Sequence, residues 1–296
     1  MHDTMFPVPG AELCARTWGE RSDPAILLIA GSARSMDWWD DEFCRRLAAG
    51  GRFVIAYDQR DTGRSTSFPA GAPPYTLRDL VADVTGLLDA LRIGVVHLAG
   101  IFSGAGLALR VALAHPARVR SLTLMCAASA TPGTRIGPGP PPAVAGRADA
   151  GATPGEIDWS DRGAVVDHLV RETQRAGGPF TADEPQLRRL AERVFDRTRD
   201  MRACHRNHRI VVATPPSADL LAAVAAPTLV LHGTLDTMTD MARARELASG
   251  MPHARLVAME GVGHEFPPPA VWSPVVAEIL ASTERLPPAG VPGSAP

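Results

Sequence analysis

Short apolar runs alternate along the chain with longer segments whose apolar residues recur at helical spacing. The apolar runs are predicted to be strands, at residues 25–30, 53–57, 95–99, 121–126, 228–231 and 255–259. Strands that are apolar at nearly every position suit a parallel sheet covered on both faces. The segments predicted to be helices include residues 39–51, 76–93 and 106–116. This alternation predicts an α/β fold with a doubly wound, mostly parallel sheet.

One long region breaks the alternation, because no strand run is convincing between residues 127 and 226. It opens with a segment rich in Pro and Gly, in which we expect residues 137–142 to be mobile, and continues with helices predicted near 161–176 and 184–205. Such an insertion behaves as a helical cap over the carboxyl edge of the sheet, where open α/β folds bind ligands. The predicted organisation is a core of residues 1–130 and 226–284, a helical cap of residues 131–225 and a flexible tail of residues 285–296.

The stretch VVHLAGIFSGAG, residues 95–106, carries a strand directly into a helix. A turn of this kind with the pattern G-x-S-x-G holds the nucleophilic serine of many acyl-transfer enzymes. Here the glycines stand at Gly100 and Gly104, but the central position is Phe102. If Ser103 were the central residue, glycines would be needed at 101 and 105, which are Ile and Ala. The glycine frame therefore places Phe102 at the apex of the turn, with positive φ.

Two further polar residues follow predicted strands. Asp236 comes just after residues 228–231, and His264 lies in the loop after residues 255–259. Carboxyl ends of neighbouring parallel strands share one edge, so we expect the two side chains to lie within hydrogen-bonding distance. A plain loop histidine and a helix N-cap are the alternative interpretations of His264 and Asp236, and an N-cap role is compatible with catalysis.

Four motifs occur in an order typical of one family: LLIAGSARSMDWWDDEF, DQRDTGRS, HGTLD and GVGHEFP. Over residues 5–130 and 220–282 the chain resembles the α/β-hydrolase superfamily, in particular the small-molecule esterase branch that includes aclacinomycin methylesterase and other polyketide-tailoring enzymes. The resemblance implies Asp236 as the catalytic acid and His264 as the base. It implies an oxyanion loop at Ala30, Gly31 and Ser32, with the backbone amide of Ser103 as second donor. It also puts Phe102 where the family has its serine.

Several other residues are candidates for weaker roles. Trp38 and Trp39 could wall a pocket for a flat ligand or pack against a helix start. Asp61 and Arg64 are expected to brace a loop beneath the site rather than to touch substrate. Cys204, His205 and His208 superficially suggest a metal site, but the segment lacks further ligands at suitable spacing. We therefore predict a solvated cap helix there and no metal.

The composition and charge of the chain argue against several classes of partner and location. Lys and Arg total 30 against 32 Asp and Glu, giving a net charge of −2, which argues against nucleic acid as a partner. No apolar run approaches the ~18 residues of a membrane span, and the N-terminus does not resemble a signal peptide, so a cytoplasmic location is expected. The four cysteines are widely spaced and predicted to be mostly buried, reduced thiols. No cofactor motif occurs, and the oligomeric state stays open.

These features favour an enzyme that uses no acyl-enzyme. A His264–Asp236 pair can act as an acid–base catalyst on a bulky, carbonyl-rich small molecule, in ring closure, elimination, decarboxylation or isomerisation. Phe102 would then form an apolar pocket floor. One alternative is a hydrolase that uses Ser103, or a water activated by His264. Another is a protein that binds or shields a ligand without turnover, in which the strand-to-helix turn at Phe102 is relaxed.

Overall fold

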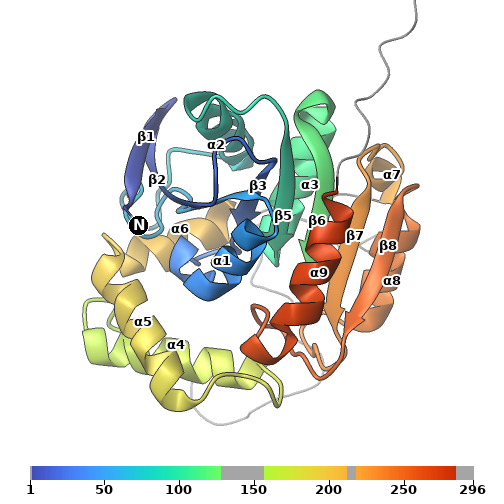
Figure 1. Cartoon of the computed structure of the whole chain (residues 1–296). Coiled ribbons are helices and arrows are strands. Elements are labelled where there is room, and N and C mark those ends of the chain that lie inside the picture. The colour runs from blue at the N-terminus through green and yellow to red at the C-terminus, as the bar shows by residue number, and fades with distance from the viewer. Residues whose placement is uncertain (1, 128–156, 212–217, 285–296) are drawn as a thin grey trace, which may run out of the picture.

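An eight-stranded sheet forms the centre of the molecule, with strand order β1-β2-β4-β3-β5-β6-β7-β8 (Figure 1). The computed structural model describes residues 2–127, 157–211 and 218–284. The strands are β1 (Thr4–Val8), β2 (Ala11–Trp18), β3 (Ala25–Ile29), β4 (Phe53–Tyr57), β5 (Val96–Ile101), β6 (Val119–Met125), β7 (Thr228–Gly233) and β8 (Ala254–Met259). Strands β3 to β8 run parallel, whereas β1 and β2 pair antiparallel at one edge. The predicted doubly wound, mostly parallel sheet is confirmed.

The sequence pattern located the six parallel strands to within two residues at each end, but it missed β1 and β2. Both missed strands carry polar and charged residues between apolar ones, as in the AELCARTW of β2, so neither reads as a continuous apolar run. They lie at the edge of the sheet, where a strand can leave one face partly exposed and needs no fully apolar sequence.

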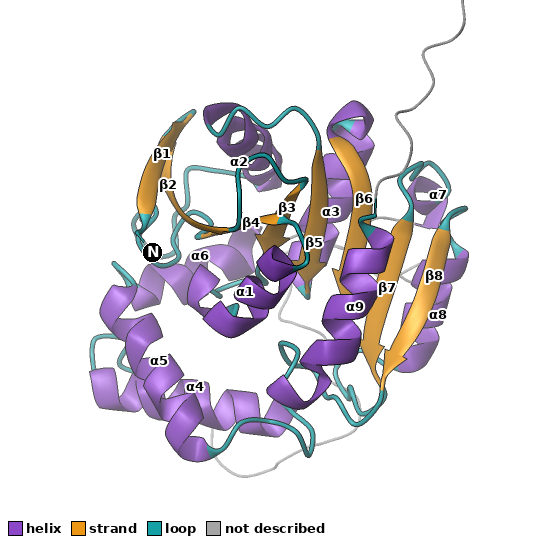
Figure 2. Ribbon diagram, viewed as in Figure 1, coloured by secondary structure: helices purple, strands orange, loops and turns teal. Residues whose placement is uncertain are grey.

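Helices cover both faces of the sheet (Figures 1 and 2). One face carries α2 (Leu77–Ala90), α3 (Ser103–Ala114) and α8 (Met241–Ser249), and the other carries α1 (Asp41–Ala49) and α9 (Trp272–Ser282). Strand β3 shows the division, because Leu27 and Ile29 join the core on the α2–α3 face, and Ile26 and Leu28 join the core beneath α1 and α9. Alternate residues of one apolar strand therefore fill two separate hydrophobic cores.

The described part of residues 131–225, the segment predicted as a cap and called the cap below, contains α4 (Arg162–Ala176), α5 (Glu184–Arg197), α6 (Met201–Val211) and α7 (Ala218–Leu221). The single helix predicted over 184–205 is wrong. The chain becomes extended at Thr198, and the carboxylate of Asp200 accepts the amide of Ala203 at the start of α6. The stretch 137–142 and the tail 285–296 lie outside the described residues.

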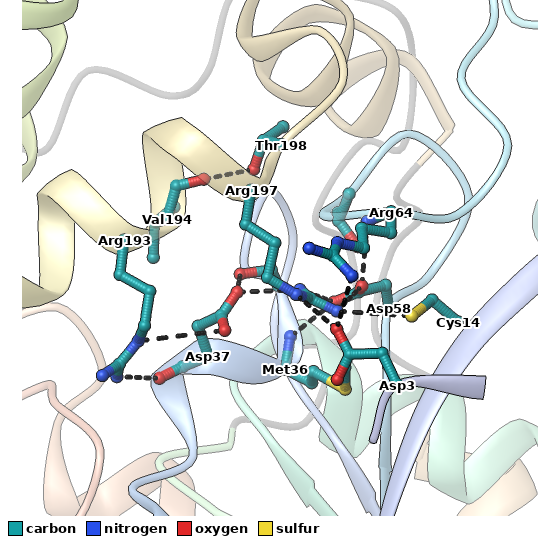
Figure 3. Close-up of polar contacts among 12 residues, drawn as sticks. Asp3, Cys14, Met36, Asp37, Asp58, Arg64, Arg193, Val194, Arg197 and Thr198 are labelled. Carbon is teal, nitrogen blue, oxygen red and sulfur yellow. Dashed lines mark hydrogen bonds and ion pairs between the residues drawn. The ribbon is translucent and has the colours of Figure 1, made fainter. Parts of the chain in front are cut away.

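Arg197, at the end of α5, ties the cap to the core (Figure 3). Its guanidinium lies 2.6 Å from Asp58, 2.8 Å from Asp37 and 3.0 Å from Asp3, and its side chain is only 7% exposed. Burial alone would lower the pKa of Arg197, but the three carboxylates outweigh burial and raise that pKa, so the side chain stays charged. Asp58 also accepts the backbone amide of Met36, which starts the segment leading to Trp38.

Helix α6 faces inward, contrary to the solvated helix predicted from the sequence. Cys204, His205 and His208 are buried, and His208 accepts the amide of Ala33 at Nδ1 while its Nε2–H donates to the carbonyl of Arg60. Their spacing places these side chains on one side of the helix, and the core below supplies polar partners that a sequence does not reveal. Within the described ranges, no group of three metal-ligating side chains lies close enough to hold an ion. All four cysteines are buried and free, as expected.

Removing the charge of Arg197 is predicted to destabilise the fold strongly. Arg197→Met would remove the arginine shared by the buried carboxylates of Asp37 and Asp58, and such a loss costs about 3–5 kcal/mol in free energy of unfolding. Urea titration measures this change. The matched control is Arg188→Met, because Arg188 forms ion pairs on the exposed side of α5. That control should leave the unfolding midpoint nearly unchanged, and equal effects of both variants would contradict the role given to Arg197.

Acid is predicted to destabilise the protein through buried neutral histidines. Burial, with Arg34 nearby, lowers the pKa of His205 to about 3, and burial, with Arg52 and Arg120 nearby, lowers that of His97 to about 4. In the unfolded chain both protonate near 6.5, so the free energy of unfolding falls as the pH drops below that value. Each histidine contributes a slope of up to about 1.4 kcal/mol per pH unit. Denaturant titrations between pH 7 and 5 should give a shallower slope for His205→Phe than for the native chain; identical slopes would refute this account.

Candidate active site

Phe102 stands at the turn between β5 and α3, with φ 55° and ψ −127°. Its amide donates to the carbonyl of Met125 at 3.0 Å, which holds the turn against β6. A side chain at Gly100 would collide with the backbone of Gly104, and one at Gly104 would collide with the backbone of Ala30. The predicted position and positive φ of Phe102 are therefore confirmed, and the two flanking glycines are required by close backbone contacts.

The ring of Phe102 lies against the candidate base. Its centroid is 4.2 Å from that of His264 with an interplanar angle of 24°, and it meets Phe266 edge-on at 5.5 Å. It also packs so closely on Gly31 that a side chain there would lie 2.9 Å from the ring. A bulky residue with positive φ costs about 1–3 kcal/mol, and these aromatic contacts offset part of that cost.

His264 and Asp236 meet at the carboxyl edge of the sheet, as predicted, with Nδ1 and Oδ2 2.8 Å apart. The other oxygen of Asp236 accepts the amides of Met238 and Thr239, so the carboxylate is fixed on both sides. Because an ionised carboxylate can only accept, the hydrogen resides on Nδ1 and Nε2 keeps a lone pair. The N-cap of α8 is Asp240, so the alternative of Asp236 as the cap of that helix is wrong.

The predicted oxyanion loop differs from expectation in one contact. The backbone amide of Ser32 donates to Oγ of Ser103 at 2.6 Å, and the two serine hydroxyls lie 2.8 Å apart. The loop itself is held by Gln59, whose side-chain amide donates to the carbonyl of Ala30. Within the part of the chain that the structure describes, the side-chain partner of His264 is Asp236 and not Ser103. The hydroxyl of Ser103 is therefore engaged with the loop rather than with the base.

A cavity of about 620 Å³ lies between this edge of the sheet and the cap. Its lining includes Phe102, Ser103, His264, Trp38, Phe266 and, from α5, Leu190. Of the two tryptophans proposed as a wall, Trp38 lines the cavity and Trp39 does not, because Trp39 is buried against Phe43 and the edge of Phe266.

The expected loop brace below the site is present at Asp61. Its carboxylate accepts the amide of Phe68, the hydroxyl of Tyr75 and the side-chain amide of Asn207. Arg64 differs, since its side chain is largely exposed and reaches Asp3 at 3.5 Å, and only its backbone amide contacts the buried Asp58. Neither residue lines the cavity.

Sequence reasoning missed a direct connection between the histidine loop and the cap. The amide of His264 donates to the carbonyl of Ala176 at 2.7 Å, at the end of α4. The neighbouring carboxylate of Glu265 accepts the amide of Gly178 and the hydroxyl of Thr181, each at 2.8 Å. Side chains at Gly263 or Gly178 would collide with the opposing backbone. The motif GVGHEFP contained the only signal, its closely spaced glycines.

Comparisons with known proteins agree with this geometry. Residues 24–268 match the family described as alpha/beta hydrolase fold. The chain belongs to the α/β-hydrolase family. It is 32% identical over 282 residues to rhodomycin D methylesterase DnrP of Streptomyces peucetius, covering 90% of this chain and 92% of that protein. The corresponding esterase DauP of Streptomyces sp. strain C5 is 31% identical over 280 residues, with the same coverage.

Solved structures show the same fold. The enol-lactonase from Burkholderia xenovorans LB400 superposes with a TM-score of 0.71 at 23% identity, over 94% of this chain and 99% of that one. At this identity the likeness concerns the fold alone. The two sequence relatives are named methylesterases, and this α/β hydrolase is a member of an enzymatic family. None of the helices within the described ranges is long and apolar enough to cross a membrane.

The contact between the histidine loop and the cap leads to a prediction about Gly263. Gly263→Ala must push Ala176 and Gly177 away from the loop, because a β-carbon there overlaps their backbone atoms. We expect a loss of about 1–3 kcal/mol, as for other overpacked positions, and a lower melting temperature. The control is Gly94→Ala, where a β-carbon meets no atom within 4 Å. Equal melting temperatures for the two variants would show that the loop and cap are not tightly packed.

Proposed function

We propose that this α/β hydrolase acts on a bulky, carbonyl-rich small molecule by acid–base catalysis at His264 and Asp236, without a cofactor and without an acyl-enzyme. The proposal rests mainly on the ring of Phe102, which occupies the apex of the turn between β5 and α3 and stacks on the imidazole of His264. Acyl transfer needs a nucleophile at this apex within reach of the base. A phenyl ring supplies none, while the acid–base pair beside it is kept.

The remaining groups suit proton transfer next to a carbonyl. The Nε2 lone pair of His264 can accept a proton from carbon, and Asp236 stabilises the imidazolium that results. Cyclisation, elimination, decarboxylation and isomerisation all proceed through such a step. A cavity of about 620 Å³ accommodates a multi-ring ligand, and the rings of Trp38, Phe102 and Phe266 offer flat apolar surfaces to it. The likeness to rhodomycin D methylesterases favours a polyketide-like substrate.

Hydrolysis of a methyl ester is the second candidate, because the two esterase relatives match nearly the whole chain. In this reaction His264 would activate a water molecule, since the hydroxyl of Ser103 is hydrogen-bonded to the amide of Ser32 rather than to His264. Both candidates use the same base, and they differ in whether the proton comes from carbon or from water. A protein that binds ligand without turnover is the third alternative, and it predicts no dependence on His264.

Isotope labelling with rhodomycin D and a panel of β-dicarbonyl compounds distinguishes these reactions. In D₂O the proposed chemistry introduces deuterium at carbon next to a carbonyl faster than in the absence of protein, and His264→Ala reduces the exchange to the protein-free rate. Ester hydrolysis instead releases methanol and, in H₂¹⁸O, places ¹⁸O in the product acid. Mass spectrometry reports both outcomes. Methanol release without carbon exchange would replace the proposed function by the second candidate, and ligand binding without either change would support the third.

Restoring the serine should restore acyl transfer. Phe102→Ser places a hydroxyl at the apex beside His264, so the variant should react with a serine-directed fluorophosphonate and weakly hydrolyse p-nitrophenyl esters, while the native chain does neither. Adding His264→Ala should remove both gains. Covalent labelling of Ser103 by the fluorophosphonate in the native chain, together with efficient ester hydrolysis, would show that Ser103 is the nucleophile after all.

A further inference from the structure

Two serines that line the cavity, as the candidate base does, form a hydrogen-bonded pair. The amide of Ser32 donates to Oγ of Ser103 at 2.6 Å, and the two hydroxyl oxygens are 2.8 Å apart. Both residues line the cavity together with Phe102 and His264, and both are partly exposed to it. Ser32 is the residue whose free amide was expected to face the substrate. In this structure the hydrogen of that amide is directed to another side chain.

A count of hydrogens on Ser103 shows what its hydroxyl can do. A hydroxyl has one hydrogen and two lone pairs. One lone pair accepts the Ser32 amide, so the hydrogen remains available, either to the hydroxyl of Ser32 or to an oxygen in the cavity. Accepting a hydrogen bond from an amide polarises the O–H and strengthens it as a donor. Ser103 is thereby prepared to donate rather than to attack.

We propose that the hydroxyl of Ser103 is the oxyanion donor of this enzyme, polarised by the Ser32 amide behind it. The proposal deepens the proposed function, on which it rests. His264 Nε2 removes a proton from carbon next to the carbonyl, the C–H electron pair forms the carbon–carbon double bond, and the carbonyl π pair moves to oxygen. That oxygen then accepts the hydrogen bond from Ser103 without proton transfer. The proton on His264 returns to carbon or to the leaving group in the later step.

The arrangement explains why a side chain takes a role that a backbone amide usually has. The ring of Phe102 packs on Gly31 and on His264, so it occupies space in front of the loop that carries Ser32. The hydroxyl of Ser103 extends from the first turn of α3. It accepts a hydrogen bond from the Ser32 amide, and its own hydrogen can be donated to an oxygen atom in the cavity. Removing one such donor typically lowers kcat by about 10²–10³-fold.

The test uses 4-nitrophenol, whose phenolate imitates an enolate and absorbs visible light. A donor at the site favours the bound phenolate, so the bound phenol should titrate at lower pH in the native protein than in solution. Ser103→Ala should raise the pKa of the bound phenol by at least about one unit, a tenfold loss of phenolate. Ser103→Thr keeps the hydroxyl and should restore the native value. Trp38→Ala removes a wall of the cavity and should weaken binding, which locates the probe there.

Ser32→Ala is the matched control, because it removes a hydroxyl at 2.8 Å but keeps the amide. It should preserve most of the shift. An unchanged titration in Ser103→Ala, a shift lost only in Ser32→Ala, or no saturable binding of 4-nitrophenol at millimolar concentration would each overturn the proposal. The probe does not depend on turnover. A native phenolate shift lost in Ser103→Ala, together with no carbon exchange in D₂O, would therefore reject the proposed function while leaving the donor in place.

Discussion

The close approach of α3 to β3 and β5 is the constraint on which the candidate site depends. It requires glycine at positions 100 and 104, because a β-carbon at either would overlap backbone of the neighbouring element. In the turn that these contacts define, Phe102 has a positive φ, and its side chain is directed at the carboxyl edge of the sheet. The turn thus presents whatever side chain occupies position 102, and here it presents a phenyl ring to His264.

The cap is not an independent layer above this edge. Buried charge holds one side of it, where Arg197 enters a cage of Asp3, Asp37 and Asp58. Backbone contact holds the other, where α4 ends against the loop of His264. The ion pairs of Arg197 tolerate little displacement, because an unpaired buried charge is costly. The contacts between glycine and backbone tolerate little displacement either, because any closer approach causes steric overlap. The position of the base is therefore coupled to the position of the cap.

At the carboxyl edge of the sheet, His264 is hydrogen-bonded to Asp236 and stacked on the ring of Phe102. The imidazole has a carboxylate on one side and, at the apex of the turn, a phenyl ring that carries no nucleophilic atom. A histidine base, an apolar surface beside it and a pair of hydroxyl groups that line the same cavity are suited to accept a proton and to stabilise charge on oxygen. In the proposed function these groups serve proton transfer at carbon rather than acyl transfer.

The residue pattern alone was enough to predict the six parallel strands, the contact between Asp236 and His264, and the position of Phe102 at the apex of the turn. Each depends on local patterns: continuous apolar runs, residues that end neighbouring strands, and two glycines four residues apart. The folded arrangement was needed to reveal that His205 and His208 are buried, that Trp39 does not line the cavity, and that Ser32 and Ser103 are hydrogen-bonded. These outcomes depend on side chains that are distant in sequence, 71 residues apart for the two serines and 175 for His208 and Ala33. A hydroxyl or an imidazole can form hydrogen bonds both with water and with groups in the core. Its partner is therefore known only when the fold has brought the two groups to within about 3 Å of each other.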